Sequence, residues 1–144
     1  MGLFDFFTNS AQAQRKSHLK NLLQVGMADG NLDQVELKYL IDLARKLKMP
    51  EDELQEILSG AEKVKFSPPS SFEAKVDQLH DLVHMMVING EVHEQELKIC
   101  KSFALKLDIL PKMVDDLVDQ MVHRTRKGES REEIVKELSS LNLN

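Results

Sequence analysis

Two short segments of this sequence, sixty residues apart, group acidic side chains around a glycine and end on a glutamate. The first, residues 27–36, carries Asp29, Asp33 and Glu36, and the second, residues 87–96, ends on Glu96. Carboxylate oxygens grouped around a glycine turn are the ligands that proteins offer to Ca²⁺ or Mg²⁺. These four residues are therefore the candidate metal ligands of the chain.

Neither segment is a complete calcium loop. With the glycine at the sixth position of an EF-hand loop, the first two ligand positions hold apolar residues: Val25 and Met27 in the first segment, Met85 and Val87 in the second. A true EF-hand is therefore not expected. Asp33 and Glu36 have the spacing of a capping box at a helix start, which explains both acids without a metal. Asp29 has no such explanation, because it follows a helix, where the dipole disfavours negative charge.

Two interpretations of the acidic segments therefore stay open. In the first, the acids only cap helices and interact with solvent. In the second, two or three carboxylates hold Ca²⁺ or Mg²⁺ with water completing the shell. Few protein oxygens give weak binding, so we expect a dissociation constant of about 10⁻⁴ to 10⁻³ M in that case.

Two other patterns carry residues of chemical interest. His80 and His84 stand one helical turn apart, as in the HExxH helix of zinc proteases, but Asp81 replaces the glutamate and no clear third ligand follows. We interpret both as histidines at the edge of the core, with a zinc hydrolase as a third alternative. Cys100 falls at a core position and is expected to be buried. Without a phosphate loop, serine elbow or paired catalytic carboxylates, the sequence predicts no enzyme.

The elements that must position these residues are helices. Apolar residues recur at intervals of three and four along most of the chain, so the sequence predicts an all-α fold. Seven helices are expected, at residues 11–28, 33–47, 51–64, 72–88, 93–107, 111–127 and 131–141. Capping boxes at Ser70 with Glu73 and at Ser130 with Glu133 mark the starts of the fourth and seventh helices.

The two halves of the chain resemble one another. A shift of sixty residues places Gly30 on Gly90, Glu36 on Glu96, and the apolar positions of the neighbouring helices on one another. The pattern predicts one compact domain, a bundle built from two pseudo-repeated three-helix units around a pseudo-twofold axis. Its expected parts are an N-terminal segment (1–17), the first repeat (18–64), a linker (65–71), the second repeat (72–127) and a C-terminal helix (128–144).

The composition and charge of the chain indicate which kinds of partner and which compartment to expect. The chain has 144 residues, a net charge of -5 and one cysteine. Few of its cations are clustered, which argues against a nucleic-acid-binding protein. The basic run 123–127 falls where a helix is expected to end, and cations there stabilise the helix dipole. With no secretion signal or membrane span, a cytoplasmic protein is expected. Phe4, Phe6 and Phe7 either dock on the core or, alternatively, attach the chain to a membrane surface or a partner.

The stretch ADGNLDQVELKYLIDLARKL, residues 28–47, resembles the signature of the TerB-like, tellurite-resistance family. The likeness covers about residues 18–120. It implies a compact helical domain in bacterial stress and envelope-associated systems, with the acids of the turn proposed to bind metal. In the second half it leaves Glu96 and Glu94, since Asn89 and His93 depart from the pattern. The resemblance implies a non-enzymatic interaction module with a protein partner; the alternative is a dedicated divalent-metal-binding protein.

Overall fold

The chain folds into helices joined by short turns and one longer linker. The computed structural model describes residues 3–28, 30–88 and 90–141, with side chains from residue 10 onward except Glu62. Within these ranges there is no strand, and the elements in order are α1 (Leu3–Gly26), α2 (Gln34–Lys46), α3 (Glu51–Gly60), the 3₁₀ helix η1 (Ala61–Lys63), α4 (Phe72–Val87), α5 (Glu94–Lys106), α6 (Pro111–Arg126) and α7 (Arg131–Ser140). The all-α prediction with seven α-helices is confirmed.

The first helix is the element whose start the sequence misplaced. It begins at Leu3 rather than at residue 11, because the polar stretch 8–14 is helical although it carries no apolar periodicity. The third helix also ends early, at Gly60, and continues as the 3₁₀ turn η1. The other helices begin and end within one residue of the predicted positions.

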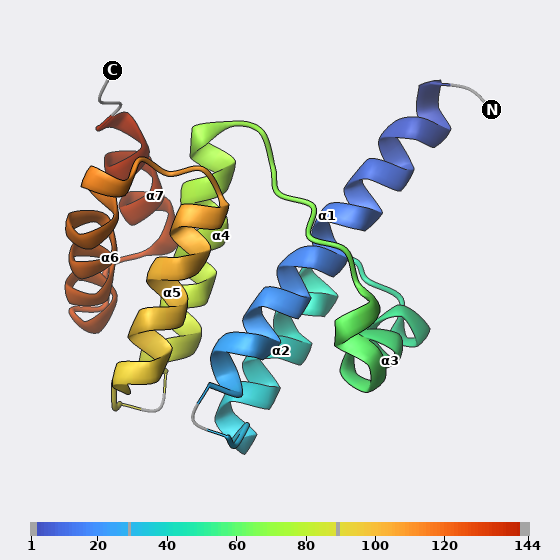
Figure 1. Ribbon diagram of the computed structural model, residues 1–144, viewed down its shortest axis with the longest axis horizontal. Coiled ribbons are helices and arrows are strands. Elements are labelled where there is room, and N and C mark those ends of the chain that lie inside the picture. The colour runs from blue at the N-terminus through green and yellow to red at the C-terminus, as the bar shows by residue number, and fades with distance from the viewer. Residues whose placement is uncertain (1–2, 29, 89, 142–144) are drawn as a thin grey trace.

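The helices form two neighbouring groups. Figure 1 shows α1, α2 and α3 in one group and α4 to α7 in the other, with the linker after α3 crossing between them. Helix α4 is central, because it packs against α1, α5, α6 and α7. The turn between α1 and α2 and the turn between α4 and α5 lie at the same end of the molecule (Figure 1).

One hydrophobic core joins both groups. Its buried apolar residues come from all seven α-helices and include Leu22, Leu40, Leu79 and Met85, all without exposed surface. Continuous burial of this kind is the main stabilising contribution in a domain of this size. Cys100 belongs to the same core, as the sequence predicted.

Several helix starts are stabilised by serine side chains. At α7, Ser130 accepts the N–H of Glu133 at 3.2 Å, which confirms that predicted cap. At α4 the predicted box of Ser70 with Glu73 is wrong by one residue. The helix begins after Ser71, whose hydroxyl accepts the N–H three residues later at 3.1 Å.

The helix ends use left-handed residues. Lys48, Asp108 and Gly128 have φ of 58°, 65° and 85°, and the N–H after each donates to the carbonyl five residues back at 2.9–3.2 Å. This bonding is the Schellman cap, which satisfies carbonyls left free at a helix end. Gly30 and Gly90 are left-handed as well, at 88° and 87°, as their predicted role after a helix requires.

The described residues contain no helix long and apolar enough to cross a membrane. The backbone of Phe4, Phe6 and Phe7 belongs to α1, but their side chains lie outside the part of the chain that the structure describes. Their predicted attachment to a membrane surface or a partner stays a prediction.

Candidate functional site

The first acidic turn is built as a helix cap. Asp33 precedes α2, and its Oδ1 accepts the N–H of Glu36 at 2.7 Å, while Glu36 Oε1 accepts the N–H of Asp33 at 3.2 Å. The predicted capping box is thus confirmed. Glu36 is only 1% exposed, and its Oε2 lies against the end of α1, 3.7 Å from where a Cβ of Gly26 would stand. Asp29 lies outside the described residues.

The second acidic turn follows the same plan. His93 precedes α5 and donates its N–H to Glu96 Oε1 at 3.4 Å. Glu96 has no exposed surface. Burial of the Cys100 thiol raises its pKa, and the negative charge of Glu96 raises it further. Glu94 is exposed and pairs with Lys98 at 3.7 Å, and Asn89 lies outside the described residues.

The predicted ligands are not assembled into a metal centre within the described ranges. Among residues 3–28, 30–88 and 90–141, no three His, Cys, Asp or Glu side chains are grouped so that they could hold an ion. Asp33, Glu36 and Glu96 are therefore not brought together as a set of three. A site that includes Asp29 falls outside this test and stays a prediction.

The structure places a different polar cluster at the centre of the fold. Asp81 of α4 is 3% exposed and accepts a hydrogen bond from the Tyr39 hydroxyl at 3.2 Å. Its other oxygen lies 2.7 Å from His18 Nε2, and Arg131 forms an ion pair with the oxygen that accepts from Tyr39. Arg131 also reaches Asp77 at 3.4 Å. The cluster therefore ties together α1, α2, α4 and α7.

This Asp81 cluster was missed by the sequence analysis, which noted Asp81 only as a departure from a zinc motif. Its partners His18, Tyr39 and Arg131 lie 63, 42 and 50 positions away in the chain, so no local sequence pattern could indicate them. One signal was available: Asp81 falls between His80 and Leu82 in a segment that periodicity assigns to the core. A buried carboxylate needs paired, hydrogen-bonding partners, which predicts that some exist without naming them.

Burial sets the protonation of the cluster. It lowers the pKa of His18 from 6.5 to about 4, and the nearby charge of Arg131 acts in the same direction. Burial and Arg131 also lower the pKa of His80 to about 4. Burial raises the pKa of Tyr39 to about 12. Both imidazoles are therefore neutral at pH 7, and Tyr39 keeps the proton that it donates to Asp81.

The tautomer of His18 follows from these contacts. A neutral His18 that contacts a carboxylate oxygen at 2.7 Å must carry its proton on Nε2. Its Nδ1 is then an acceptor, and among the described residues nothing donates to it. His18 therefore acts as a fixed hydrogen-bond donor that positions Asp81.

A pocket of about 440 Å³ opens beside the Asp81 cluster. Its walls come from α2, α4, the end of α6 and the start of α7, and they include His80, His84, Tyr39 and Thr125. Two of these residues have a buried polar atom with no hydrogen-bond partner among the described residues, namely His80 Nδ1 and Thr125 Oγ1. Buried polar atoms are normally satisfied, so these two are unused hydrogen-bonding groups beside the pocket.

A second and larger hollow, about 780 Å³, adjoins this pocket. The two share Lys46, Arg131 and Glu132 in their walls. The larger one runs between α4 and α7, over the apolar side chains of Phe72 and Val135. We call the two hollows together the α4/α7 groove.

Comparisons with family models, with curated proteins and with solved structures gave no match to this chain. The TerB-like resemblance therefore stays a prediction, and what the protein does is argued below from its own residues.

Proposed function

We propose that this protein is a non-enzymatic helical interaction module that holds a segment of a partner protein in the α4/α7 groove. The observation that supports this most is the size and continuity of the groove, whose two hollows of about 780 and 440 Å³ share wall residues. Concave surfaces of this size, partly apolar and with polar groups at the rim, are where proteins bind ligands and partner segments.

The groove chemistry indicates what kind of segment fits. The larger hollow has an apolar floor formed by Phe72 and Val135. Its rim carries equal numbers of opposite charges, namely Lys46, Arg131 and Lys136 against Glu73, Asp77 and Glu132. A partner segment with an apolar anchor flanked by charges of both signs would match this rim, because complementary charges fix register more than they add affinity.

The state of the reactive groups supports a binding role over a catalytic one. Burial raises the pKa of the Cys100 thiol, which keeps it protonated and unreactive. The Asp81 carboxylate is engaged by His18, Tyr39 and Arg131 and has little exposed surface. The contacts of Asp81 hold helices together, so this carboxylate has a structural role.

The biological setting is proposed from the sequence alone. The resemblance of residues 28–47 to the TerB-like signature supports a role in a bacterial stress or tellurite-resistance-related system. The alternative function is a dedicated divalent-metal-binding protein that uses Asp29, Asp33 and Glu36. The engagement of Asp33 and Glu36 in a capping box favours the interaction module, because each acid already gives one oxygen to the backbone.

We also infer that the module arose from two copies of one three-helix unit. Helices α2 and α5 begin and end at positions sixty residues apart. Gly30 and Gly90 share the same left-handed backbone, and so do Lys48 and Asp108. Lysine and aspartate both occupy a conformation that favours glycine, and such a coincidence at matched positions supports a common origin.

Charge reversal in the groove tests the proposed function. A Lys46→Glu/Lys136→Glu variant changes two rim charges, and a Lys112→Glu/Lys127→Glu variant makes the same change at exposed positions at the two ends of α6. Proteins bound by each variant are compared by affinity purification from the native cell, and any candidate is then titrated as a purified protein. The groove variant is expected to lose the partner and the control to keep it. Equal binding by both variants would refute the assignment of this groove.

A further inference from the structure

His80 and His84 stand one turn apart on α4, in the wall of the 440 Å³ pocket. Their ring centres are 6.0 Å apart. His84 is half-buried and packs against the Tyr39 ring at 4.6 Å between centres, which limits its movement. His80 is only 5% exposed. Two imidazoles held in this way at the edge of a polar pocket are a different feature from the acidic turns.

We propose that this pocket binds one divalent transition-metal ion through His80 and His84, with the Glu132 carboxylate and water completing the coordination. The role assigned is binding alone, and no hydrolytic step is attached to it. The site lies in the smaller hollow of the α4/α7 groove, but its test uses a metal ion alone and needs no partner protein.

The ring separation is close to what a metal requires. A metal bonded at about 2.0–2.1 Å to one nitrogen of each ring lies about 3.2 Å from each ring centre, so a tetrahedral angle places the centres about 5 Å apart. The observed 6.0 Å must therefore shorten by about 1 Å on binding, which requires one or both rings to rotate. The spacing of four residues on one helix is the one that zinc-binding helices use.

A carboxylate stands behind His80 in the place of an outer-shell partner. His80 Nδ1 has no hydrogen-bond partner among the described residues, and Asp81 Oδ1 lies 3.8 Å from it. A histidine that binds metal through Nε2 donates its Nδ1 proton to such a carboxylate. Closing this gap would satisfy the unpaired nitrogen and orient the ring, so Asp81 is assigned as a positioning residue.

The pocket carries charges of both signs, and one of its acids, Glu129, is paired with Arg124 at 3.7 Å. Its walls carry Asp42, Glu129 and Glu132 against Lys46 and Arg131, and Arg131 is already paired with Asp81 and Asp77.

Glu132 lines the same pocket as both histidines, from the start of α7. Its side chain is exposed, which leaves it free to rotate. In the structure described here it has not joined the histidines, since no group of three ligands is assembled within the described ranges. We therefore expect Glu132 to move on binding.

Imidazole ligands determine the class of ion. They suit Zn²⁺, Ni²⁺, Cu²⁺ and Co²⁺, whereas Ca²⁺ and Mg²⁺ prefer oxygen. Affinity should rise from Co²⁺ through Ni²⁺ to Cu²⁺, the order common to nitrogen sites. The same preference separates this site from the acidic turns, which offer mainly carboxylates.

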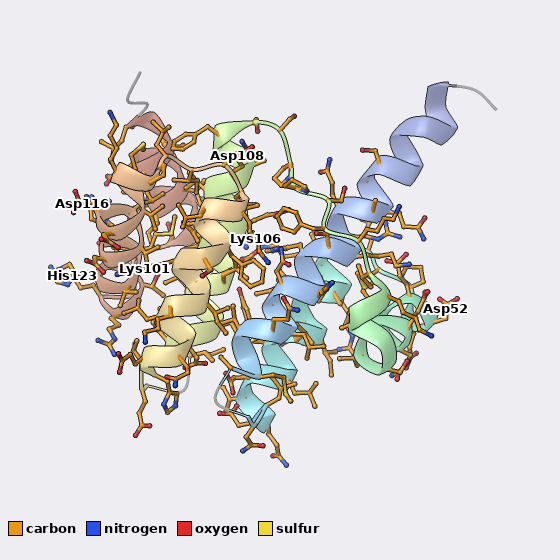
Figure 2. The ribbon with its side chains drawn as sticks, viewed as in Figure 1. Asp52, Lys101, Lys106, Asp108, Asp116 and His123 are labelled. Carbon is orange, nitrogen blue, oxygen red and sulfur yellow. The ribbon has the colours of Figure 1, made fainter. Side chains whose placement is uncertain are left out.

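The test is a titration of the full chain with Co²⁺, followed by visible absorption and by isothermal calorimetry, in excess Ca²⁺ to occupy oxygen sites. Wild type is compared with His84→Ala, with Glu132→Gln, and with His123→Ala as the matched control. His123 is exposed and points away from the bundle on α6 (Figure 2). Because His84→Ala could fail to fold, the broadening of backbone signals by Co²⁺ is also mapped on the wild-type protein by NMR.

Saturable one-to-one binding is expected in wild type and in the His123 variant. Binding should weaken by more than about tenfold in His84→Ala and by less in Glu132→Gln, and broadening should centre on residues 80–84 and 131–132. No saturable binding, unchanged binding in a folded His84→Ala variant, or broadening centred on His93 or His123 would each overturn the proposal. An adventitious ion at exposed histidines would give the last of these results.

Discussion

Acid should destabilise this protein well above the pH at which its carboxylates protonate, and His18 is a main cause. The ring is 4% exposed and its neutral form donates to Asp81. Burial lowers its pKa from 6.5 to about 4, so the unfolded chain binds a proton in a range where the folded protein does not. Stability linked to His18 is therefore fully present above pH 6.5 and is lost as the pH falls toward 4.

The size of the effect follows from the pKa difference. At about 1.4 kcal/mol per pKa unit, the fall from 6.5 to about 4 corresponds to roughly 3 kcal/mol at pH 4. Between pH 5 and 6 the loss is about 1 kcal/mol for each pH unit. A typical domain is stable by about 5–15 kcal/mol, so this one histidine would account for a large fraction. His80, with a pKa of about 4, acts in the same sense.

Urea unfolding at a series of pH values measures this dependence directly. A His18→Gln variant keeps an N–H donor for Asp81 but cannot titrate, so its slope between pH 5 and 6 should be smaller than that of wild type by about 1 kcal/mol per pH unit. His123→Gln, an exposed position on α6, is the control (Figure 2). Equal slopes for wild type and His18→Gln would refute the reasoning. If the variant does not fold, an NMR titration that places the wild-type His18 pKa near 6.5 would refute it as well.

Three further predictions concern the turns. Asp33→Ala removes the cap of α2 and should lower the free energy of unfolding in urea by about 1 kcal/mol; an unchanged midpoint would count against capping. Lys48→Gly and Asp108→Gly relieve left-handed backbone strain, so each should raise the free energy of unfolding by about 0.5–1 kcal/mol and with it the thermal midpoint. A lower midpoint would show that the native side chains stabilise these turns. Calorimetric titration with Ca²⁺ and Mg²⁺ tests the acidic turn. If the turn binds a cation, we expect saturable heat in wild type and none in an Asp29→Ala/Glu36→Ala variant. The absence of heat up to millimolar ion would exclude cation binding by this turn.

The fold could be predicted because its signals are local. A short polar side chain followed by a glutamate three residues later predicts a helix start, as at Ser130 and Asp33. Both predicted caps are confirmed. The start of α1 was missed because residues 8–14 carry no apolar pattern, and the helix there is visible only in the folded chain. At α4 two adjacent serines compete for the cap, and the sequence alone favoured Ser70 over Ser71.

The site could not be predicted in the same way, because its contacts join distant positions. Asp33 and Glu36 satisfied two patterns at once, a calcium loop and a capping box, and only hydrogen-bond geometry separates them. Asp81 satisfied no pattern, since its partners come from three other helices. Motif spacing therefore directed attention to the acids that serve the backbone and away from the buried carboxylate at the centre.

The position of the Asp81 cluster has a physical reason, which a comparison of the two halves of the chain indicates. In the first half, the chain after α3 covers α1: Lys20 Nζ donates to the Val64 carbonyl, just before the linker, at 2.7 Å, and Ser17 Oγ accepts the linker N–H of Ser67 at 2.8 Å. A shift of sixty residues places Ser17 and Lys20 at Asp77 and His80, where α7 does the covering instead. A linker backbone offers carbonyl and N–H groups, so small polar side chains and a lysine suffice there. Helix α7 brings Arg131, a partly buried cation, and the second half supplies the carboxylates that pair with it as Asp77 and Asp81. Arg131 thus belongs to α7, and the start of this helix also lines the pocket beside His80 and His84.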